Sequence, residues 1–252
     1  MQSKIYQELS ERKARGIKSF TLLIDPDKFE QDTSLKLAQK KAFEHVDLIF
    51  VGGSLINGSN IGFTIQSIKA HTHKPVIIFP GSNMHLDMSA DAILFLSLIS
   101  GRNPEFLIGQ HIVAAPFLKK SNLEILATGY MLIDSGKATT VSYISNTTPI
   151  PYDKPEVAVC TAMAGEMLGL KLIYADAGSG AQKAISSKMI RMLSKAIDVP
   201  LIIGGGIRSA AQAAEILEAG ADVIVVGNAI EDNPELIGEI ASEIKKINLR
   251  HG

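Results

Sequence analysis

The stretch PLIIGGGIRSAAQAAEILEAGADVIVVGNAI, residues 200–230, decides the fold of this chain. Leu201–Ile203 and Val223–Val226 are short aliphatic runs, typical of strands that are buried on both faces. Between them, Ser209 is suited to cap a helix and Gly220 to end it. The stretch therefore predicts two parallel strands joined by a helix.

A glycine turn follows each of these strands, at Gly204–Gly206 and at Gly227-Asn228. Glycine accepts positive φ and lets a ligand approach the backbone closely, so such turns expose amide N–H groups to an anion. In (β/α)8 barrels a phosphate site commonly lies in the loops after strands seven and eight. A single glycine turn would only indicate a tight bend. Two of them favour phosphate binding.

The composition limits the class of protein. The chain has 252 residues, 46% hydrophobic and 20% charged, close to the roughly 250 residues of one barrel, so we expect a single domain over 1–252. The net charge of −1 gives no support for nucleic-acid binding. The N-terminal residues are polar, and no run approaches the about 18 apolar residues of a membrane span. One cysteine, Cys160, suits a reducing compartment. We expect a cytoplasmic protein with at most peripheral membrane contact.

The hydrophobic pattern along the chain predicts alternating strands and helices. The expected strands are Ser19–Asp25, Val46–Val51, Pro75–Phe79, Ala92–Leu96, Leu123–Asp134, Leu172–Tyr174, Leu201–Ile203 and Val223–Val226. Apart from the helix after Ser209, the expected helices are Ile5–Lys13, which closes the bottom of the barrel, Leu35–Phe43, Gly58–Lys69, Pro104–Leu118, Pro155–Leu168, Ser186–Ala196 and Asn233–Ile247. This order predicts an α/β (β/α)8 TIM barrel.

Two connections depart from the regular pattern. Between Phe79 and Ala92 there are too few residues for two loops and a full helix, so we expect a degenerate third helix. The barrel would be thinly covered there, which would suit a long apolar ligand. Ser135–Pro151 is a long polar segment, either a lid over the site, in which Tyr143 and Ser145 would cover a bound substrate, or a solvated loop.

Chemically useful side chains follow the other strands. Asp25 and Lys28 come after the first strand and Ser54 after the second, and these residues suit Mg²⁺ and a phosphate. A plain polar turn is the alternative for Asp25–Lys28. Tyr174–Gly180 brings a phenol, a carboxylate and a serine to the same edge, where Asp176 could take a proton from a hydroxyl nucleophile. His111, alone on its helix, indicates a structural residue.

Five motifs together resemble a known family, the geranylgeranylglyceryl phosphate synthases and their bacterial heptaprenylglyceryl phosphate relatives. The motifs are LLIDPDK (Leu22–Lys28), VGGS (Val51–Ser54), YADAGSGA (Tyr174–Ala181), IGGGIR (Ile203–Arg208) and VGN (Val226–Asn228). The last two occur in many phosphate-binding barrels, whereas the first three in this order are specific. GRNPEFLIGQH (Gly101–His111) is similar to the branch called group II.

The resemblance implies a prenyltransferase that joins a polyprenyl diphosphate, with geranylgeranyl diphosphate expected, to the C3 hydroxyl of sn-glycerol 1-phosphate, releasing diphosphate. It implies Mg²⁺ as cofactor, bound by Asp25 and Ser54, and a homo-oligomer. Asp176 and Tyr174 would be catalytic, although the family usually has glutamate at position 176. The expected substrate-binding residues are Lys28, Tyr174, Ala175, Asp176, Ala177, Gly178, Ser179, Gly180, Gly205, Gly206, Gly227 and Asn228.

Two alternatives stay open. One is another phosphate-handling barrel, such as an isomerase or lyase, which needs the late glycine turns but neither the Asp25 and Ser54 pair nor a gap at the third helix. The other is a non-catalytic barrel that binds a phosphate ligand, given the aspartate at position 176.

Overall fold

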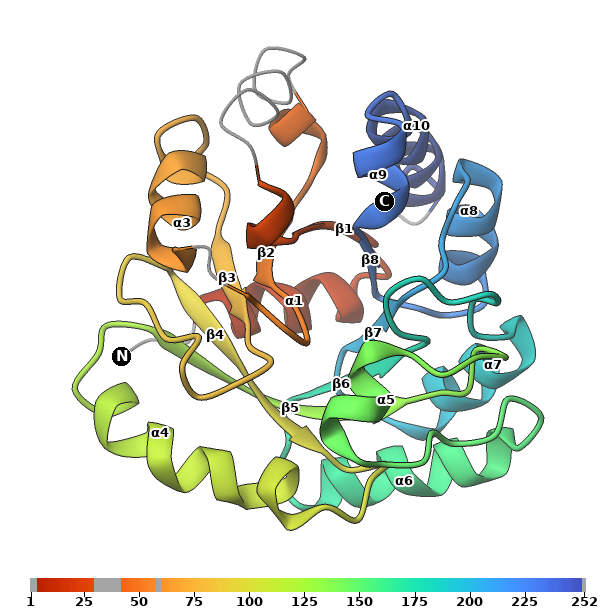
Figure 1. The fold of residues 1–252 in the computed structure, drawn as a ribbon. Coiled ribbons are helices and arrows are strands. Elements are labelled where there is room, and N and C mark those ends of the chain that lie inside the picture. Colours follow the sequence, from red (N-terminus) through yellow and green to blue (C-terminus); the bar gives the residue numbers. More distant parts are fainter. Residues whose placement is uncertain (1–3, 30–41, 58–59, 251–252) are drawn as a thin grey trace.

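The computed structural model describes residues 4–29, 42–57 and 60–250. Within them, parallel strands close into a barrel in which each strand bonds to the next and β8 bonds to β1 (Figure 1). The strands are β1 (Ser19–Ile24), β2 (Leu48–Gly52), β3 (Val76–Phe79), β4 (Ala92–Leu98), β5 (Glu124–Leu132), β6 (Leu172–Asp176), β7 (Leu201–Gly204) and β8 (Val223–Val226). The predicted (β/α)8 barrel is confirmed.

Helices surround the barrel (Figure 1). They are α1 (Lys4–Ala14), α3 (Ile61–Lys69), α4 (Gln110–Leu118), α5 (Thr140–Ser145), α6 (Pro155–Met167), α7 (Ser187–Ala196), α8 (Ala210–Glu218), α9 (Asn228–Asp232) and α10 (Leu236–Asn248), with short turns η1 (Pro26–Lys28), η2 (Ala42–His45) and the π-helical η3 (Glu105–Gly109). The helix expected at Leu35–Phe43 lies largely outside the described residues. No helix in the described part of the chain is long and apolar enough to cross a bilayer.

Alternate residues of each strand face the barrel interior, and the others face the helices, because side chains alternate along a strand. Phe50, Leu94 and Tyr174 belong to the inner cluster, whereas Phe20 and Ile203 belong to the layer under the helices. Asp176, the last residue of β6, has the same parity as Tyr174, so its side chain points toward the centre of the barrel mouth.

The bottom of the barrel is closed by α1, as predicted. Ile5 and Leu9 pack against the inner cluster. Glu124, at the start of β5, caps the helix, since its carboxylate accepts hydrogen bonds from the N–H groups of Ile5 (2.8 Å) and Tyr6 (2.9 Å). Polar groups at this end therefore hold the fold, and the site lies at the opposite end.

The connection between β3 and β4 has no helix, so the degenerate third helix is confirmed. The two strands pair only at Ile77 with Ala92 and at Ile78 with Ile93, whereas β4 pairs with β5 along its whole length. Above Ile93 the sheet opens into a seam. We use "seam" for this gap between β3 and β4.

Several predicted boundaries were wrong. Ser135–Pro151 is not all loop: it contains α5, which a capping box at Thr139 and Ser142 starts. β4 extends to Leu98 and β6 to Asp176, because pairing with β5 continues beyond the apolar runs.

The last predicted helix, Asn233–Ile247, corresponds to α10, which begins later, at Leu236. A short helix that was not predicted, α9, precedes it from Asn228, and Pro234 lies between the two, because proline has no N–H with which to continue a helix.

Candidate active site

Two adjoining cavities open at the carboxyl ends of the strands. The first, here called the polar cavity, is lined by Asp25, Lys28, Ser54, Tyr174, Asp176, Gly178, Ser179, Gly180, Gly205, Gly206, Gly227 and Asn228, among others. The structure thus brings together all the predicted site residues except two. Ala175 and Ala177 lie in the buried layer under the helices instead.

One side of the polar cavity is made of glycine turns. Gly205 and Gly206 have φ of +78° and +73°, a region that side chains other than glycine rarely adopt. A Cβ on Gly205 would also lie 2.7 Å from Asp176 Oδ1. The Asn228 side chain donates to Ser179 Oγ at 3.3 Å, joining the turns after β8 and β6. Exposed amide groups at such turns suit an anion.

The opposite side of the polar cavity carries Asp25, Lys28 and Ser54. Asp25 Oδ1 caps η1 by accepting a hydrogen bond from the N–H of Asp27 at 3.0 Å. Lys28 is paired with Glu231, Nζ to Oε2 at 3.0 Å, and this hydrogen bond raises the pKa of Lys28. Lys28, predicted to bind phosphate, therefore stays charged and has a protein partner here.

The donor groups on this side fit Mg²⁺. The described residues contain no group of three or more His, Cys, Asp or Glu side chains placed to hold a metal. Asp25 and Ser54 nevertheless offer a carboxylate and a hydroxyl to one cavity. Mg²⁺ commonly uses one or two carboxylates and completes its coordination with water and substrate phosphate.

Asp176 is held by two donors at the centre of the mouth. It is only 7% exposed, its Oδ2 accepts the hydroxyl of Tyr130 at 2.6 Å, and its Oδ1 accepts the N–H of Gly178 at 2.8 Å. Burial raises the pKa of Asp176, and the two hydrogen bonds oppose that rise. Burial, with the nearby carboxylate, holds the pKa of Tyr130 and of Tyr174 well above the usual value, so both phenols stay protonated.

Aromatic rings surround Asp176. Tyr174 and Phe79 stack with centroids 5.6 Å apart, and Tyr130 meets Tyr174 edge-on at 5.4 Å. Sequence reasoning missed Tyr130 and Phe79. No signal in the sequence marked them, because β3 and β5 are largely apolar on both faces and do not reveal which side chains point inward.

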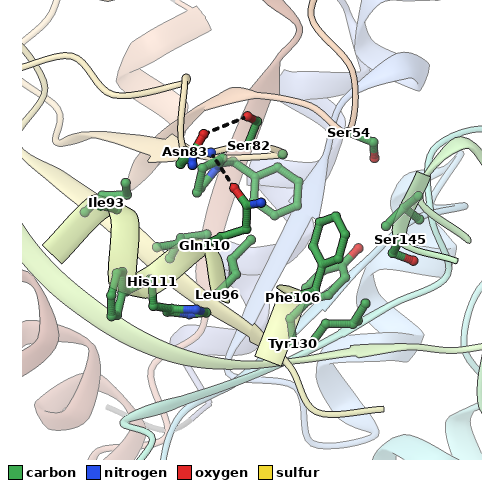
Figure 2. Close-up of a pocket in the computed structure, with 18 of the residues that line it drawn as sticks. Ser54, Ser82, Asn83, Ile93, Leu96, Phe106, Gln110, His111, Tyr130 and Ser145 are labelled. Carbon is green, nitrogen blue, oxygen red and sulfur yellow. Dashed lines mark hydrogen bonds between the residues drawn. The ribbon is translucent and has the colours of Figure 1, made fainter. Parts of the chain in front are cut away.

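The second cavity, here called the apolar cavity, occupies the seam between β3, β4 and α4 (Figure 2). Its lining is mostly hydrophobic and includes Phe79, Leu86, Ile93, Leu96, Phe106, Ala114 and Leu118. Gly53, Ser54 and Phe79 line both cavities, so the two adjoin at the ends of β2 and β3.

A histidine forms part of the apolar wall. His111, on α4, is 8% exposed and meets Phe95 edge-on at 4.4 Å. Burial lowers the pKa of His111, which a hydrogen bond with the backbone of Leu96 partly offsets. The ring is therefore neutral and packed, as a structural residue would be.

The segment predicted as either lid or loop covers both cavities. Val141, Ile144 and Ser145 line the apolar cavity and Thr140 lines the polar one. Ser145 is buried, whereas Tyr143 is 85% exposed and points away from the site. Of the two residues suited to covering a substrate, only Ser145 lies at a cavity.

Known proteins share this architecture. The sequence is 55% identical over 240 residues to the geranylgeranylglyceryl phosphate synthase of Spirosoma linguale, covering 95% of this chain and 96% of that protein. It is 41% identical over 233 residues to the protein of that name from Pyrococcus furiosus, covering 92% and 90%.

A solved structure agrees with the fold and the sequence. The (S)-3-O-geranylgeranylglyceryl phosphate synthase of Thermoplasma acidophilum, in complex with its substrate sn-glycerol-1-phosphate, superposes with a TM-score of 0.89 and 32% identity, covering 96% of this chain and 98% of that one. The resemblance read from the five motifs is thereby confirmed. Since the family model also matches residues 10–247, the chain belongs to the PcrB family.

Proposed function

We propose that this protein is a prenyltransferase that joins a polyprenyl diphosphate to the C3 hydroxyl of sn-glycerol 1-phosphate, forming an ether bond and releasing diphosphate. One observation carries the proposal: an apolar cavity and a polar cavity with glycine turns adjoin at Ser54 and Phe79. The names of the relatives, and the glycerol phosphate bound by the Thermoplasma acidophilum enzyme, support it.

Each substrate matches one cavity. The glycine turns at Gly205-Gly206 and Gly227-Asn228 suit the phosphate of glycerol phosphate. The apolar cavity suits a prenyl chain, with geranylgeranyl favoured by the relatives' names. The diphosphate would then lie toward Asp25 and Ser54, where the cavities adjoin.

The reaction needs a hydroxyl nucleophile next to an allylic carbon. Asp176 is the carboxylate nearest the centre of the mouth, and its side chain is fixed by two hydrogen bonds, so it is suited to receive the proton of the C3 hydroxyl. The glycine turns orient the hydroxyl by holding the phosphate. Asp25 and Ser54 would hold Mg²⁺, which supplies positive charge to the departing diphosphate.

Neither alternative explains the apolar cavity. An isomerase or lyase acting on small phosphate esters has no use for a hydrophobic cavity in the seam above Ile93. A non-catalytic barrel has no need of a carboxylate held between two donors at the mouth. These features favour the transferase.

The direct test combines the protein with sn-glycerol 1-phosphate, geranylgeranyl diphosphate and Mg²⁺, and measures diphosphate release and product mass. We expect diphosphate and the prenyl ether in equal amounts. Binding of glycerol phosphate without diphosphate release, across several prenyl lengths, would contradict the transferase and favour the binding barrel.

The Asp176→Asn variant tests the base. Asparagine has nearly the same shape and still accepts the Gly178 N–H, so glycerol phosphate should still bind. Turnover should fall about 10²- to 10⁴-fold, the usual contribution of a positioned base. Unchanged turnover would show that Asp176 is not the base.

We also propose a homo-oligomer in the cytoplasm. α4 carries no charged residue and exposes Ile112, Val113 and Phe117. α6 exposes Val157, and Leu168 is exposed at the C-terminal end of α6. An exposed apolar surface of this kind is typical of an interface, here with a second copy of the chain. Light scattering of purified protein should give a multiple of 27.0 kDa, and a monomer at micromolar concentration would contradict this.

The free, exposed Cys160 favours a reducing compartment.

A further inference from the structure

Tyr130 lies where the two proposed substrates would meet. It is paired with Tyr174 in the register of β5 and β6, so its ring faces the barrel interior one step below Asp176. Tyr130 lines the apolar cavity and Asp176 lines the polar one. The 2.6 Å hydrogen bond between them therefore spans the boundary of the two cavities.

Both oxygens of the carboxylate are occupied. Asp176 is 7% exposed and Tyr130 5%, and each oxygen of Asp176 already accepts a hydrogen bond, one from Tyr130 and one from Gly178. A general base must come within hydrogen-bond reach of the proton that it removes. Because Tyr130 lines the apolar cavity and Asp176 does not, an alcohol directed toward a carbon in that cavity would approach the boundary beside the Tyr130 oxygen.

We infer that Tyr130 is a catalytic residue that relays the proton of the C3 hydroxyl to Asp176; this rests on the proposed function. The alcohol proton passes to the Tyr130 oxygen while the Tyr130 proton passes to Asp176 Oδ2. The C3 oxygen uses the freed electron pair to bond the allylic carbon, and the carbon–oxygen bond to diphosphate breaks, its electrons leaving with diphosphate. Tyr130 gains one proton and loses one, so it remains a neutral phenol throughout.

Two features of the site suit this concerted transfer. The pKa of Tyr130 lies well above its usual value because of burial and the neighbouring carboxylate, so a free phenolate does not accumulate. The hydroxyl of Tyr130 has a fixed direction, because Asp176 accepts its proton. Its oxygen lone pairs stay available to a second donor.

The test compares Tyr130→Phe in two backgrounds. In the wild type, loss of the hydroxyl should lower the single-turnover rate at least about 100-fold, while the KM for glycerol phosphate changes less than about threefold. In Asp176→Glu, the carboxylate is one methylene longer and can reach the alcohol directly, so adding Tyr130→Phe should cost less than about fivefold. Tyr6→Phe, which removes a phenol hydroxyl at the bottom of the barrel, is the matched control and should leave the rate unchanged.

A proton inventory in mixtures of H2O and D2O gives a second readout that needs no variant. A relay moves two protons in the rate-limiting step, so the wild-type single-turnover rate should depend on the deuterium fraction along a curve, and Asp176→Glu along a straight line. Equal losses from Tyr130→Phe in both backgrounds, or a straight line for the wild type, would overturn the relay. A wild type that forms no prenyl ether would instead overturn the proposed function, and the relay with it.

Discussion

Phe79 and Tyr174 stack across the mouth of the barrel, with ring centroids 5.6 Å apart and planes inclined by 21°. Phe79 ends β3 and Tyr174 lies within β6, on different sides of the closed sheet. Because Phe79 lines both cavities, this stack is a shared wall between the proposed prenyl and glycerol phosphate sites.

Phe79→Ala should weaken binding of the prenyl diphosphate and leave binding of glycerol phosphate nearly unchanged. The free energy of unfolding should fall by about 1–2 kcal/mol, because Phe79 is partly buried against the inner cluster, as measured by chemical denaturation. The KM for the prenyl diphosphate should rise about tenfold or more, because the apolar cavity loses part of its lining, while the dissociation constant of glycerol phosphate changes little, because the glycine turns that would hold its phosphate stay in place. Phe79→Leu, which keeps much of the volume, is the control. An equal weakening of both substrates by Phe79→Ala would contradict the assignment.

Gly205→Ala should disrupt phosphate binding. The residue has φ of +78°, and the new methyl group would meet Asp176 Oδ1. Such strain costs about 1–3 kcal/mol, and displacement of the turn should weaken sn-glycerol 1-phosphate at least about tenfold in a calorimetric titration.

Gly238→Ala provides a matched control for that variant. Gly238 lies in α10, and a Cβ there has no neighbour within 4 Å. The substitution should leave binding unchanged and stabilise the helix by about 0.5–1 kcal/mol. Unaltered binding in Gly205→Ala would show that the turn after β7 does not hold the phosphate.

Asp222→Ala should lower stability without touching the site. This carboxylate, 7% exposed at the bottom of the barrel, accepts the N–H of Leu201 at 2.9 Å and pairs with Lys13 at 3.0 Å. Removing it leaves buried donors unpaired, at a cost of about 3 kcal/mol. Turnover at low temperature should be retained. Glu243→Ala, which breaks the surface ion pair with Lys246, is the control and should lower the free energy of unfolding by less than about 1 kcal/mol. An equal loss of stability in Asp222→Ala and Glu243→Ala would contradict the prediction.

His111→Leu should reduce the acid sensitivity of folding. Burial lowers the pKa of His111 in the folded state below the ordinary value of 6.5. As the pH falls below 6.5, the unfolded chain binds the proton more readily, so stability present above that pH is lost. In the variant, the free energy of unfolding should decline less between pH 7 and pH 5. Burial also lowers the pKa of His85, so some decline remains. Identical declines in variant and wild type would contradict the prediction.

Much of the barrel could be predicted because its signals are local. Aliphatic runs followed by glycine turns mark strands that end at a ligand-binding edge, as Leu201–Gly204 and Val223–Gly227 do. The missing third helix followed from the short distance between Phe79 and Ala92. Parallel strands then bring their carboxyl ends to one face, which explains why the residues chosen from separate motifs line one cavity.

The contacts between strands could not be predicted in this way. The hydrogen bond between Tyr130 and Asp176 depends on the register of β5 and β6, and both strands are apolar on both faces, so the sequence carries no alternation that reveals which residues point inward. The pairing of Lys28 with Glu231 likewise joins residues 203 positions apart. By contrast, α5 had a readable signal in the cap formed by Thr139 and Ser142.

In a closed sheet every strand pairs with two neighbours, so a local distortion is resisted by the pairing all around the barrel. Between β3 and β4 only two residue pairs provide this resistance. We therefore expect an apolar chain bound in the seam to displace this edge first, while the other strand pairs keep the register that positions Asp25 and Asp176. The barrel can thus widen at the seam, where it would accommodate prenyl chains, and stay rigid at the strand ends that would carry out the reaction.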